Sequence, residues 1–419
     1  MKFNYGKIFL LGFGFFGVSV IWGTYNAFVP LFLANKFHLD PAWIGFFMTL
    51  DNIAALLIQP PIGAWSDRLR TPIGRRMPFI LVGAPIGALV FGLIPLAAIL
   101  PLFVACTSTL LLSMALWRTP VVALMPDITP SPFRSQANGI INFMGGVGSI
   151  ISFLLGSRLY EINPAYPFWL GSALVLLSTI LVFSFIREPK EFVSSEEKQP
   201  GLLESLKSVI GDKDKSALRV LMAILFWFIS YSAIEAFFTL YAQNYLGYPE
   251  SSGAGARLLG QLSLMFVIFA LPAGAIGSRF GRKHTILSGI SLMTLAMFSM
   301  FFIPAETLNI VLAARVPLLG DIPVIGPILM IAGIAWALIN INSLPMVVDM
   351  TEEARIGTYT GLYYLFSTLA AILGPNINGW VVKLSGENYR YIMVVGPIFM
   401  VCALFMMLGV RRGEARIVS

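Results

Sequence analysis

The sequence predicts an all-α integral membrane protein with twelve transmembrane helices in two pseudo-symmetric halves of six. Its composition is the first supporting observation. The 419-residue chain is 57% hydrophobic and only 12% charged, with a mean hydropathy of +0.81. A water-soluble globule of this size needs more polar side chains to cover its surface. The chain is therefore expected to lie in a lipid bilayer.

Long apolar stretches are the second observation. At ~1.5 Å of rise per residue, a helix of about 20 residues spans the ~30 Å hydrocarbon core of a bilayer. Twelve such spans are expected, at residues 8–33, 42–65, 78–97, 101–125, 137–159, 167–187, 218–243, 257–277, 285–304, 322–347, 357–382 and 391–410.

A repeated basic turn between spans is the third observation, and it indicates an internal duplication. The first copy contains Gly63, Asp67, Arg68, Gly74, Arg75 and Arg76, and the second, 211 positions later, contains Gly274, Arg279, Gly281, Arg282 and Lys283. A second pattern is repeated at an interval of 222. Asp127, Arg134 and Gly139 in the first half match Asp349, Arg355 and Gly361 in the second. Two halves of common design are typical of secondary transporters, in which a site at the pseudo-symmetric interface opens to either side.

The net charge of +7 predicts membrane topology rather than nucleic-acid binding. Of the 28 Lys and Arg residues, 21 lie in segments on the same side as the N-terminus and six lie on the other side. Positive charge concentrates on the cytoplasmic side of membrane proteins. Both termini are therefore expected in the cytoplasm, and the compact loops favour a bacterial plasma membrane, the inner membrane.

A charged stretch that contains Pro and Gly, from Glu188 to Ser216, separates the two halves. It predicts an N-terminal half at 1–187, a cytoplasmic linker at 188–217 and a C-terminal half at 218–419. Apolar residues recur at helical spacing within the linker, at Leu202, Leu203, Leu206, Val209 and Ile210. They predict a short helix that lies either on the membrane surface or packed under the bundle.

The first basic turn resembles the signature of the major facilitator superfamily, Gly-x-x-x-Asp-Arg-x-Gly-Arg-Arg. Here the turn runs from Gly63-Ala-Trp-Ser-Asp67-Arg68 through Leu-Arg-Thr-Pro-Ile to Gly74-Arg75-Arg76, with four extra residues. With Gln59-Pro60 before it, Met77-Pro78-Phe79-Ile80 after it and Pro120 to Asp127 downstream, it is similar to the sucrose/proton symporters and their bacterial relatives. These belong to the glycoside-pentoside-hexuronide cation symporter group. The resemblance implies the major facilitator fold and covers the first five spans better than the second half.

Departures from that group change the chemistry that the resemblance implies. Sodium-using, melibiose-type members have cation-binding aspartates at the positions of Ala55 and Gln59. The proton is therefore expected as the coupling ion in place of sodium, and no cofactor is expected. Arg118 stands where those members have a sugar-holding aspartate, whereas plant sucrose carriers place an essential arginine at Val122 and an essential aspartate at Leu111.

Three charged residues, Asp51, Arg118 and Glu235, fall inside predicted spans, where an unpaired charge costs a few kcal/mol or more. Arg118 lies nine residues, ~14 Å of helix, from Asp127 at the span end, which places it near the midplane. Its guanidinium can bind sugar hydroxyls or pair with Asp51, and the alternative is a static ion pair between helices. Asp51, and next to it Glu235, is expected to couple proton movement, unless each is a hydrogen-bonded structural acid.

Sugar sites combine flat aromatic faces with amide groups in a mostly apolar cleft. Trp22, Tyr25 and Asn26 share one face of the first span because they are three and four positions apart. The spans that the family resemblance places around a cavity supply the other candidates, together with Tyr364. The predicted substrate-binding set is Trp22, Tyr25, Asn26, Gln59, Arg118, Asn138, Asn142, Tyr231, Gln243, Asn340, Asn342 and Tyr363.

Charges at the turns predict a cytoplasmic gate whose ion pairs hold the halves together when the site faces outward. Topology explains the arginines of this gate but not the acids among them. The predicted gate residues are Asp67, Arg68, Arg75, Arg76, Asp127, Arg134, Arg279, Arg282, Asp349 and Arg355.

The expected function is proton-coupled symport of a glycoside, a disaccharide such as sucrose or maltose, by alternating access in a monomer. Efflux of sugars or amphiphiles by proton antiport is an alternative on the same fold. A membrane sensor or scaffold is a third reading, but it predicts no charge within the spans and a sizeable soluble domain. An enzyme is not expected, because the sequence contains no nucleotide-binding loop, metal-ligand cluster or nucleophile with a base.

Overall fold

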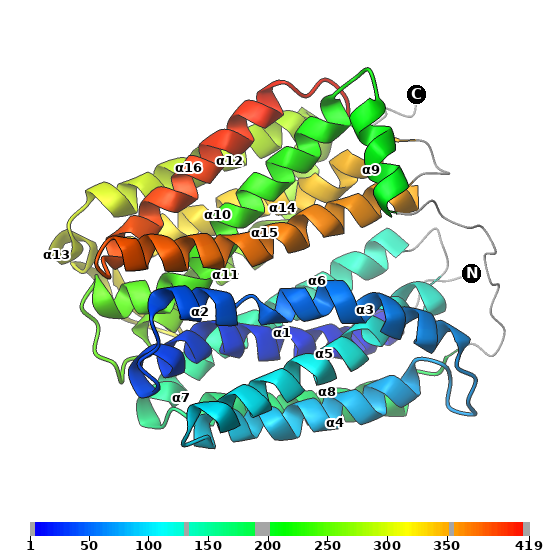
Figure 1. Cartoon of the computed structure of the whole chain (residues 1–419), viewed down its shortest axis with the longest axis horizontal. Helices are drawn as coiled ribbons and strands as arrows, with labels where there is room; N and C mark the ends of the chain where they lie inside the picture. The colour runs from blue at the N-terminus through cyan, green and yellow to red at the C-terminus, as the bar shows by residue number, and fades with distance from the viewer. Residues whose placement is uncertain (1–4, 130–133, 189–201, 352–355, 414–419) are drawn as a thin grey trace. The chain divides into compact units, whose positions relative to one another are not determined.

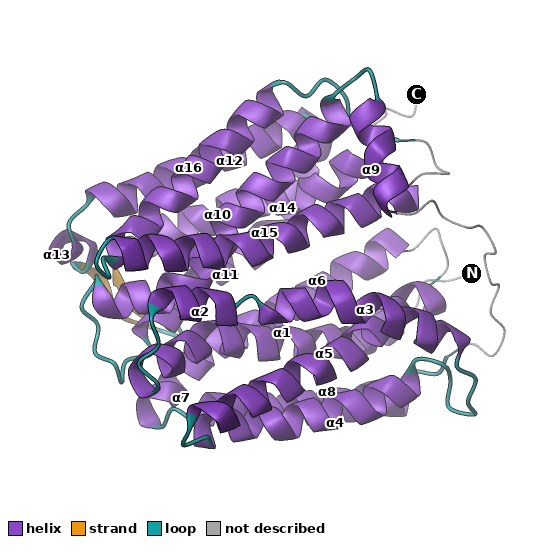
Figure 2. Ribbon diagram, viewed as in Figure 1, coloured by secondary structure: helices purple, strands orange, loops and turns teal. Residues whose placement is uncertain are grey.

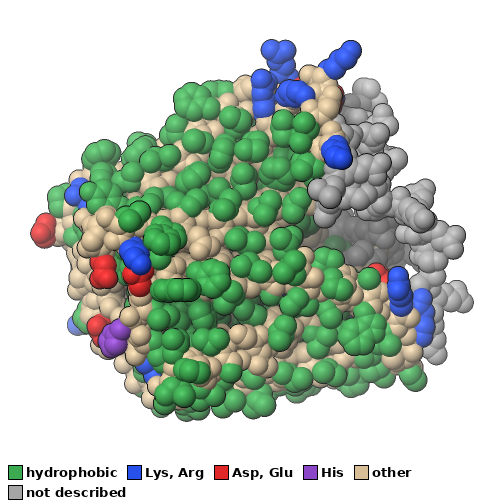
Figure 3. Space-filling view, in the orientation of Figure 1, with side chains coloured by type: hydrophobic (Ala, Val, Ile, Leu, Met, Phe, Trp, Pro, Cys, Tyr) green, Lys and Arg blue, Asp and Glu red, His purple; other side chains and the backbone are tan. Residues whose placement is uncertain are grey.

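The computed structural model of the chain describes residues 5–129, 134–188, 202–351 and 356–413. Within these residues, twelve helices are long and apolar enough to cross a membrane. This confirms the predicted all-α, twelve-span fold. Hydrophobic side chains cover the sides of the helices on the face seen in Figure 3, and charged side chains gather near the helix ends.

Contacts group the chain into two units. Unit 1 comprises Met1–Leu39, Ile53–Ser194 and Tyr248–Gly260. Its helices, labelled in Figure 1, are α1 (Tyr5–Leu31), α3 (Leu50–Arg68, from Ile53 onward), α4 (Met77–Leu93), α5 (Leu100–Ile128), α6 (Arg134–Ile150), α7 (Gly156–Ile162) and α8 (Tyr166–Phe185). Short π-helical turns at Phe32–Lys36 and Ile151–Leu155 extend α1 and join α6 to α7, and a 3-10 turn at Ile94–Leu96 follows α4.

Unit 2 comprises Asp40–Asn52, Ser195–Gly247 and Gln261–Ser419. Its helices are α2 (Pro41–Phe47), α9 (Leu202–Gly211), α10 (Ser216–Asn244), α11 (Ala254–Phe280, from Gln261 onward), α12 (Arg282–Phe302), α13 (Ala305–Leu308), α14 (Ile325–Val348), α15 (Ile356–Leu384) and α16 (Ile392–Leu408). A 3-10 turn at Tyr389–Tyr391 precedes α16. The antiparallel strands β1 (Val311–Val316) and β2 (Gly320–Pro323) form a hairpin between α13 and α14, drawn in orange in Figure 2.

The two units repeat one packing pattern. In unit 1, α1 packs on α6 and α8, and α4 packs on α5 and α8. In unit 2, α10 packs on α15 and α16, and α12 packs on α14 and α16. The first, third, fourth, fifth and sixth spans of each half are thus related in the same way. The repeat of contacts confirms the duplication that the basic turns predicted.

Glycine allows one of these helix pairs to approach closely. A Cβ atom added to Gly83 of α4 would lie 2.8 Å from Trp117 Cβ and 3.2 Å from Trp117 N on α5. Ser113 Oγ of α5 donates a hydrogen bond to Gly83 O at 2.6 Å. Small residues at such contacts are how membrane helices gain van der Waals packing, because lipid offers no hydrophobic driving force between them.

The span predicted at 42–65 is two helices rather than one. α2 ends at Phe47 and α3 begins at Leu50. Thr49 ends α2, because its hydroxyl and its N–H both donate to Phe46 O, at 2.7 and 3.0 Å. Asn376 of α15 donates its Nδ2 to Thr49 Oγ1 at 3.3 Å. Hydropathy did not show this break, because the apolar residues on both sides of Thr49, Asp51 and Asn52 average to one span.

Two other expectations are refined. The helix expected in the linker is α9, which packs beside α10 and α15 and buries Val209, so the packed alternative holds. Its preceding residues, 189–201, lie outside the described residues. The span expected at 322–347 begins only at Ile325, since residues 311–323 form the hairpin that the sequence analysis missed.

We expect Gly83→Ala to lower the thermal unfolding temperature of the purified protein, because the added methyl meets the Trp117 backbone and overpacking costs ~1–3 kcal/mol. Gly139→Ala is the matched control, since a Cβ there meets no described atom within 4 Å. Thermal unfolding in detergent measures both. An equal effect of the two substitutions would contradict the packing role of Gly83.

Candidate functional site

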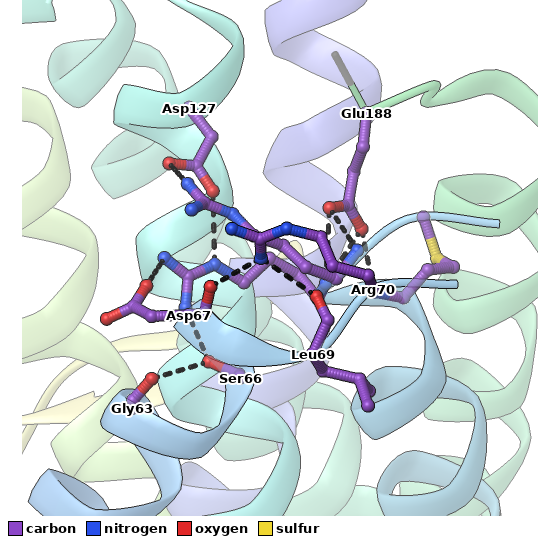
Figure 4. A network of polar contacts seen from close by, with 10 residues as sticks. Gly63, Ser66, Asp67, Leu69, Arg70, Asp127 and Glu188 are labelled. Atoms are coloured by element: carbon purple, nitrogen blue, oxygen red, sulfur yellow. Dashed lines mark hydrogen bonds and ion pairs between the residues drawn. The ribbon is translucent and has the colours of Figure 1, made fainter. Parts of the chain in front are cut away.

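The turn between α3 and α4 carries a network of ion pairs that we call the turn cluster: Asp67, Arg75, Arg76 and Asp127 (Figure 4). Asp127, near the end of α5, accepts from Arg75 Nη2 at 2.6 Å and from Arg76 Nε at 3.0 Å. Arg76 also pairs with Asp67 and bonds the Ser66 hydroxyl. One carboxylate thus serves two guanidiniums whose side chains are almost buried, which fixes α5 against the turn.

Glu188 is a member of this site that the sequence analysis missed. Its carboxylate accepts the backbone N–H groups of Arg75, Arg76 and Met77 at 2.9, 3.0 and 2.7 Å. N–H groups at the start of a helix have no acceptor within the helix, and Glu188 supplies one for those at the start of α4. The helix dipole also favours a negative charge there. Gly74 has a φ of +117°, and a Cβ there would lie 2.4 Å from Glu188 Cδ. The signal in the sequence was an acid directly after the sixth span.

Unit 2 holds a simpler counterpart of the turn cluster. Arg282, at the start of α12, pairs with Asp349 after α14 and donates to Pro345 O at 2.9 Å. Arg68 and Arg279 are exposed, and Arg279 lies over the Phe280 ring. Two other predicted gate residues, Arg355 and the side chain of Arg134, lie outside the described part of the chain. Opening and closing of these pairs remains a prediction.

The three charged residues predicted within spans are all half-buried. Asp51 lies in the first turn of α3, directly after the break, and accepts from Asn52 Nδ2 at 2.8 Å. Glu235 lies on α10, one helical turn from Tyr231. Arg118 belongs to unit 1, whereas Asp51 and Glu235 belong to unit 2. Pairing of Arg118 with either acid therefore remains part of the functional proposal.

An aromatic cluster lies within unit 2, formed by Phe228, Tyr231, Trp336 and Tyr363. The rings of Tyr231 and Trp336 stack with centroids 4.0 Å apart and planes 7° apart. Phe228 meets Trp336 and Tyr363 edge to face, at 5.3 and 6.2 Å. The Tyr363 hydroxyl lies 2.9 Å from Ser343 Oγ. Trp336 was missed in the sequence, although it precedes Asn340 by one helical turn on the same span.

Unit 1 brings together the predicted pair on α1. Trp22 and Tyr25 meet edge to face at 5.8 Å, and Tyr25 is buried. The buried indole N–H of Trp22 has no hydrogen-bond acceptor among the described residues. Asn26 on α1 and Gln59 on α3 are half-buried.

The predicted asparagines and the remaining glutamine differ in their surroundings. On α6, Asn138 and Asn142 are exposed, and Asn142 Nδ2 donates to Asn138 O. On α14, Asn342 is buried and donates to Leu338 O of its own helix and to Ala273 O, so the second bond joins α14 to α11. Asn340 and Gln243 are half-buried. For each of them, substrate contact remains a prediction.

Twelve spans in two repeated halves, with charges within the spans, define a secondary transporter and not an enzyme. The family model for the Major Facilitator Superfamily matches residues 11–375 and 258–418. The chain belongs to that superfamily.

Its relatives include both sugar carriers and efflux proteins. "Multidrug resistance protein 1" of Bacillus subtilis is 23% identical over 86% of this chain and 85% of its own. "Lactose permease" of Citrobacter freundii is 24% identical over 69% and 70%. The "Putative glycoside/cation symporter YagG" of Escherichia coli is 25% identical over 92% and 84%. A solved bacterial homologue of the human lysosomal transporter Spinster shares the fold, with a TM-score of 0.75, 15% identity and full coverage of both chains.

We expect Asp127→Ala to destabilise the protein by about 3 kcal/mol, because it removes the carboxylate that two nearly buried guanidiniums share. Thermal unfolding in detergent measures the effect. Asp212→Asn is the control, since Asp212 pairs with Arg412 on an exposed surface and its loss should not shift the unfolding temperature. A similar small effect for both variants would show that the turn cluster is not a structural clamp.

Proposed function

We propose that the protein is a proton-coupled symporter for a glycoside, a disaccharide such as sucrose or maltose, related to the glycoside-pentoside-hexuronide cation symporters. The observation that carries the proposal is the aromatic cluster of unit 2, in which Tyr231 shares α10 with the acid Glu235. Trp336 holds the Tyr231 ring in a fixed plane, and Glu235 follows one turn along α10. Flat aromatic faces bind the C–H surfaces of sugars, and adjacent polar groups bind their hydroxyls.

Unit 1 supplies hydrogen-bonding groups suited to the same substrate class. The Trp22 indole N–H is a buried donor without an acceptor among the described residues, and the proposal assigns its bond to a solute hydroxyl in a state of the cycle that exposes it. Arg118 presents several N–H donors in one plane, which suits a pair of neighbouring sugar hydroxyls. These groups favour a polyhydroxylated solute over the amphiphile that an efflux antiporter would carry, which is the second candidate.

Proton coupling in this proposal rests on the acids of unit 2. A carboxyl that meets the Arg118 guanidinium in only one state of the cycle changes its proton affinity between states. Asp51 is the first candidate and Glu235 the second. One charge moving through ~100 mV supplies ~2.3 kcal/mol, roughly a fiftyfold accumulation. The proposal takes the proton rather than sodium, because Ala55 and Gln59 offer no carboxylate.

The gate and topology complete the proposed cycle. The turn cluster and the Arg282–Asp349 pair lie at the turns that charge placement assigns to the cytoplasmic side, with both termini. Each of these pairs joins helices within one unit, so in the proposed cycle they fix the cytoplasmic helix ends of each half while the halves alternate between outward-facing and inward-facing states. A single chain contains both halves, so the proposed working unit is a monomer in a bacterial plasma membrane.

Proteoliposomes with an alkaline interior should accumulate labelled sucrose or maltose, and a protonophore should abolish the accumulation. Asp51→Asn should lose accumulation but retain sugar exchange, because coupling and binding are separate steps in this scheme. Arg118→Ala should lose both. Glu306→Gln is the control, since Glu306 is an exposed acid on α13. Uptake that does not respond to pH, or accumulation of an amphiphilic dye in inverted vesicles instead, would support the efflux candidate.

A sugar that binds should raise the unfolding temperature, since ligand at 100 times its Kd adds ~2.7 kcal/mol to stability. Tyr231→Leu should weaken that sugar's binding about tenfold, which corresponds to the loss of one aromatic contact of ~1.4 kcal/mol. Trp380→Leu is the control, because the Trp380 ring is half exposed on the side of α15. Equal Kd values for the wild type and Tyr231→Leu would remove the aromatic cluster from the site.

A further inference from the structure

The hairpin between α13 and α14 presents apolar side chains on both of its faces. Residues Ile310–Arg315 are all exposed, and the exposed fractions of Ile310, Val311 and Leu312 are 55%, 50% and 60%. Successive side chains of a strand point to opposite faces. Neither face is therefore covered by the rest of the described chain.

The tip of the hairpin also exposes apolar side chains. It reads Val316-Pro317-Leu318-Leu319-Gly320, where exposed turns are ordinarily built from Gly, Asn, Asp or Ser. Leu318 has a φ of +70°, a left-handed conformation that is costly for a residue with a Cβ, and it is 52% exposed. The strain holds an apolar side chain away from the protein without a packing gain inside the described chain. Such an outlier points to a contact outside the chain.

We propose that this hairpin inserts its apolar tip into the boundary between headgroups and acyl chains of the bilayer. The helices on either side are both membrane spans: α12 ends at Phe302, which is 69% exposed, and α14 begins at Ile325. The hairpin therefore leaves the spans at the level of the bilayer surface. Burial of its exposed apolar faces at the membrane interface is favourable.

Arg315 supports a phospholipid as the partner. It precedes the tip, its side chain is exposed, and its backbone N–H donates to Asp321 Oδ1 at 2.7 Å. That bond fixes the backbone of the strand end three residues before Leu318. A long cationic side chain can reach a lipid phosphate from there while its stem lies on the apolar surface.

A second copy of the chain is the other occupant that an exposed hairpin could take, through pairing of strand edges. The register of this hairpin argues against it. Shifts between Val311 and Ala313, and between Ala313 and Val316, interrupt the ladder. Such irregular edges are poor templates for another strand, because the backbone groups are out of step.

The test places an environment-sensitive fluorophore at the tip in the full-length protein. In a background with Cys106→Ser and Cys402→Ser, Leu318→Cys is labelled and the protein is reconstituted in phosphatidylcholine and phosphatidylglycerol vesicles. Glu387→Cys is the matched control, because Glu387 is also exposed, also has a positive φ of 61°, and lies in the connection after α15 at the same end of the spans.

We expect nitroxide lipids labelled near the headgroup to quench the fluorophore at 318 strongly and the fluorophore at 387 little. In these vesicles, the emission of the fluorophore at 318 should also lie at a shorter wavelength than that of the fluorophore at 387. Equal quenching at both sites, or none at 318, would overturn the proposal. Crosslinking between copies through position 318, without quenching by lipid, would assign the hairpin to a second copy and would also overturn it.

Discussion

Hydrocarbon offers no hydrogen bonds to the chain, and this constraint governs the rest of the structure. It requires helices in the spans, because each helix satisfies its own backbone groups. Where the backbone departs from a regular helix within a span, side chains supply the missing bonds. Thr49 caps the carbonyl of Phe46 at the break in the second span, and Asn376 bonds Thr49 in turn. Irregular backbone at membrane depth is tolerated only where it is satisfied in this way or lines a cavity.

The two halves share a packing pattern but differ in their charged turns. In unit 1, Asp67, Asp127 and Glu188 serve two arginines and the first N–H groups of α4. In unit 2, Arg282 has the carboxylate of Asp349 and the carbonyl of Pro345. Gene duplication accounts for the shared scaffold, whereas the richer network of unit 1 holds α3, α4 and α5 together at one point. Symmetry of backbone therefore does not extend to symmetry of electrostatics.

The number and order of the spans could be predicted from the sequence, because a span of about 20 apolar residues is a strong and local signal. The duplication could be predicted for a similar reason, since the basic turns recur in order. Features that depend on contacts distant in sequence could not. The cap by Glu188 joins positions 111 to 113 residues apart. The break at Thr49 is bonded by Asn376, which lies 327 positions away in the sequence.

In the candidate site too, some residues have a local signal in the sequence, whereas others are recognised only from contacts between distant residues. Asp51, Arg118 and Glu235 could be found because charge is rare in a span. The importance of Trp336 emerged only from its stacking on Tyr231, since an isolated aromatic in an apolar helix most often serves packing. Asn342 was predicted as a sugar ligand from its residue type alone, whereas its bonds to Ala273 O of α11 and to Leu338 O of its own helix could not be seen in the sequence.

The interruption after Phe47 divides the second span into two shorter helices, α2 and α3. The Asp51 carboxyl lies within one helical turn of this division. A bend of the span at this point would therefore reorient the side chains around that acid while leaving its depth in the bilayer nearly constant.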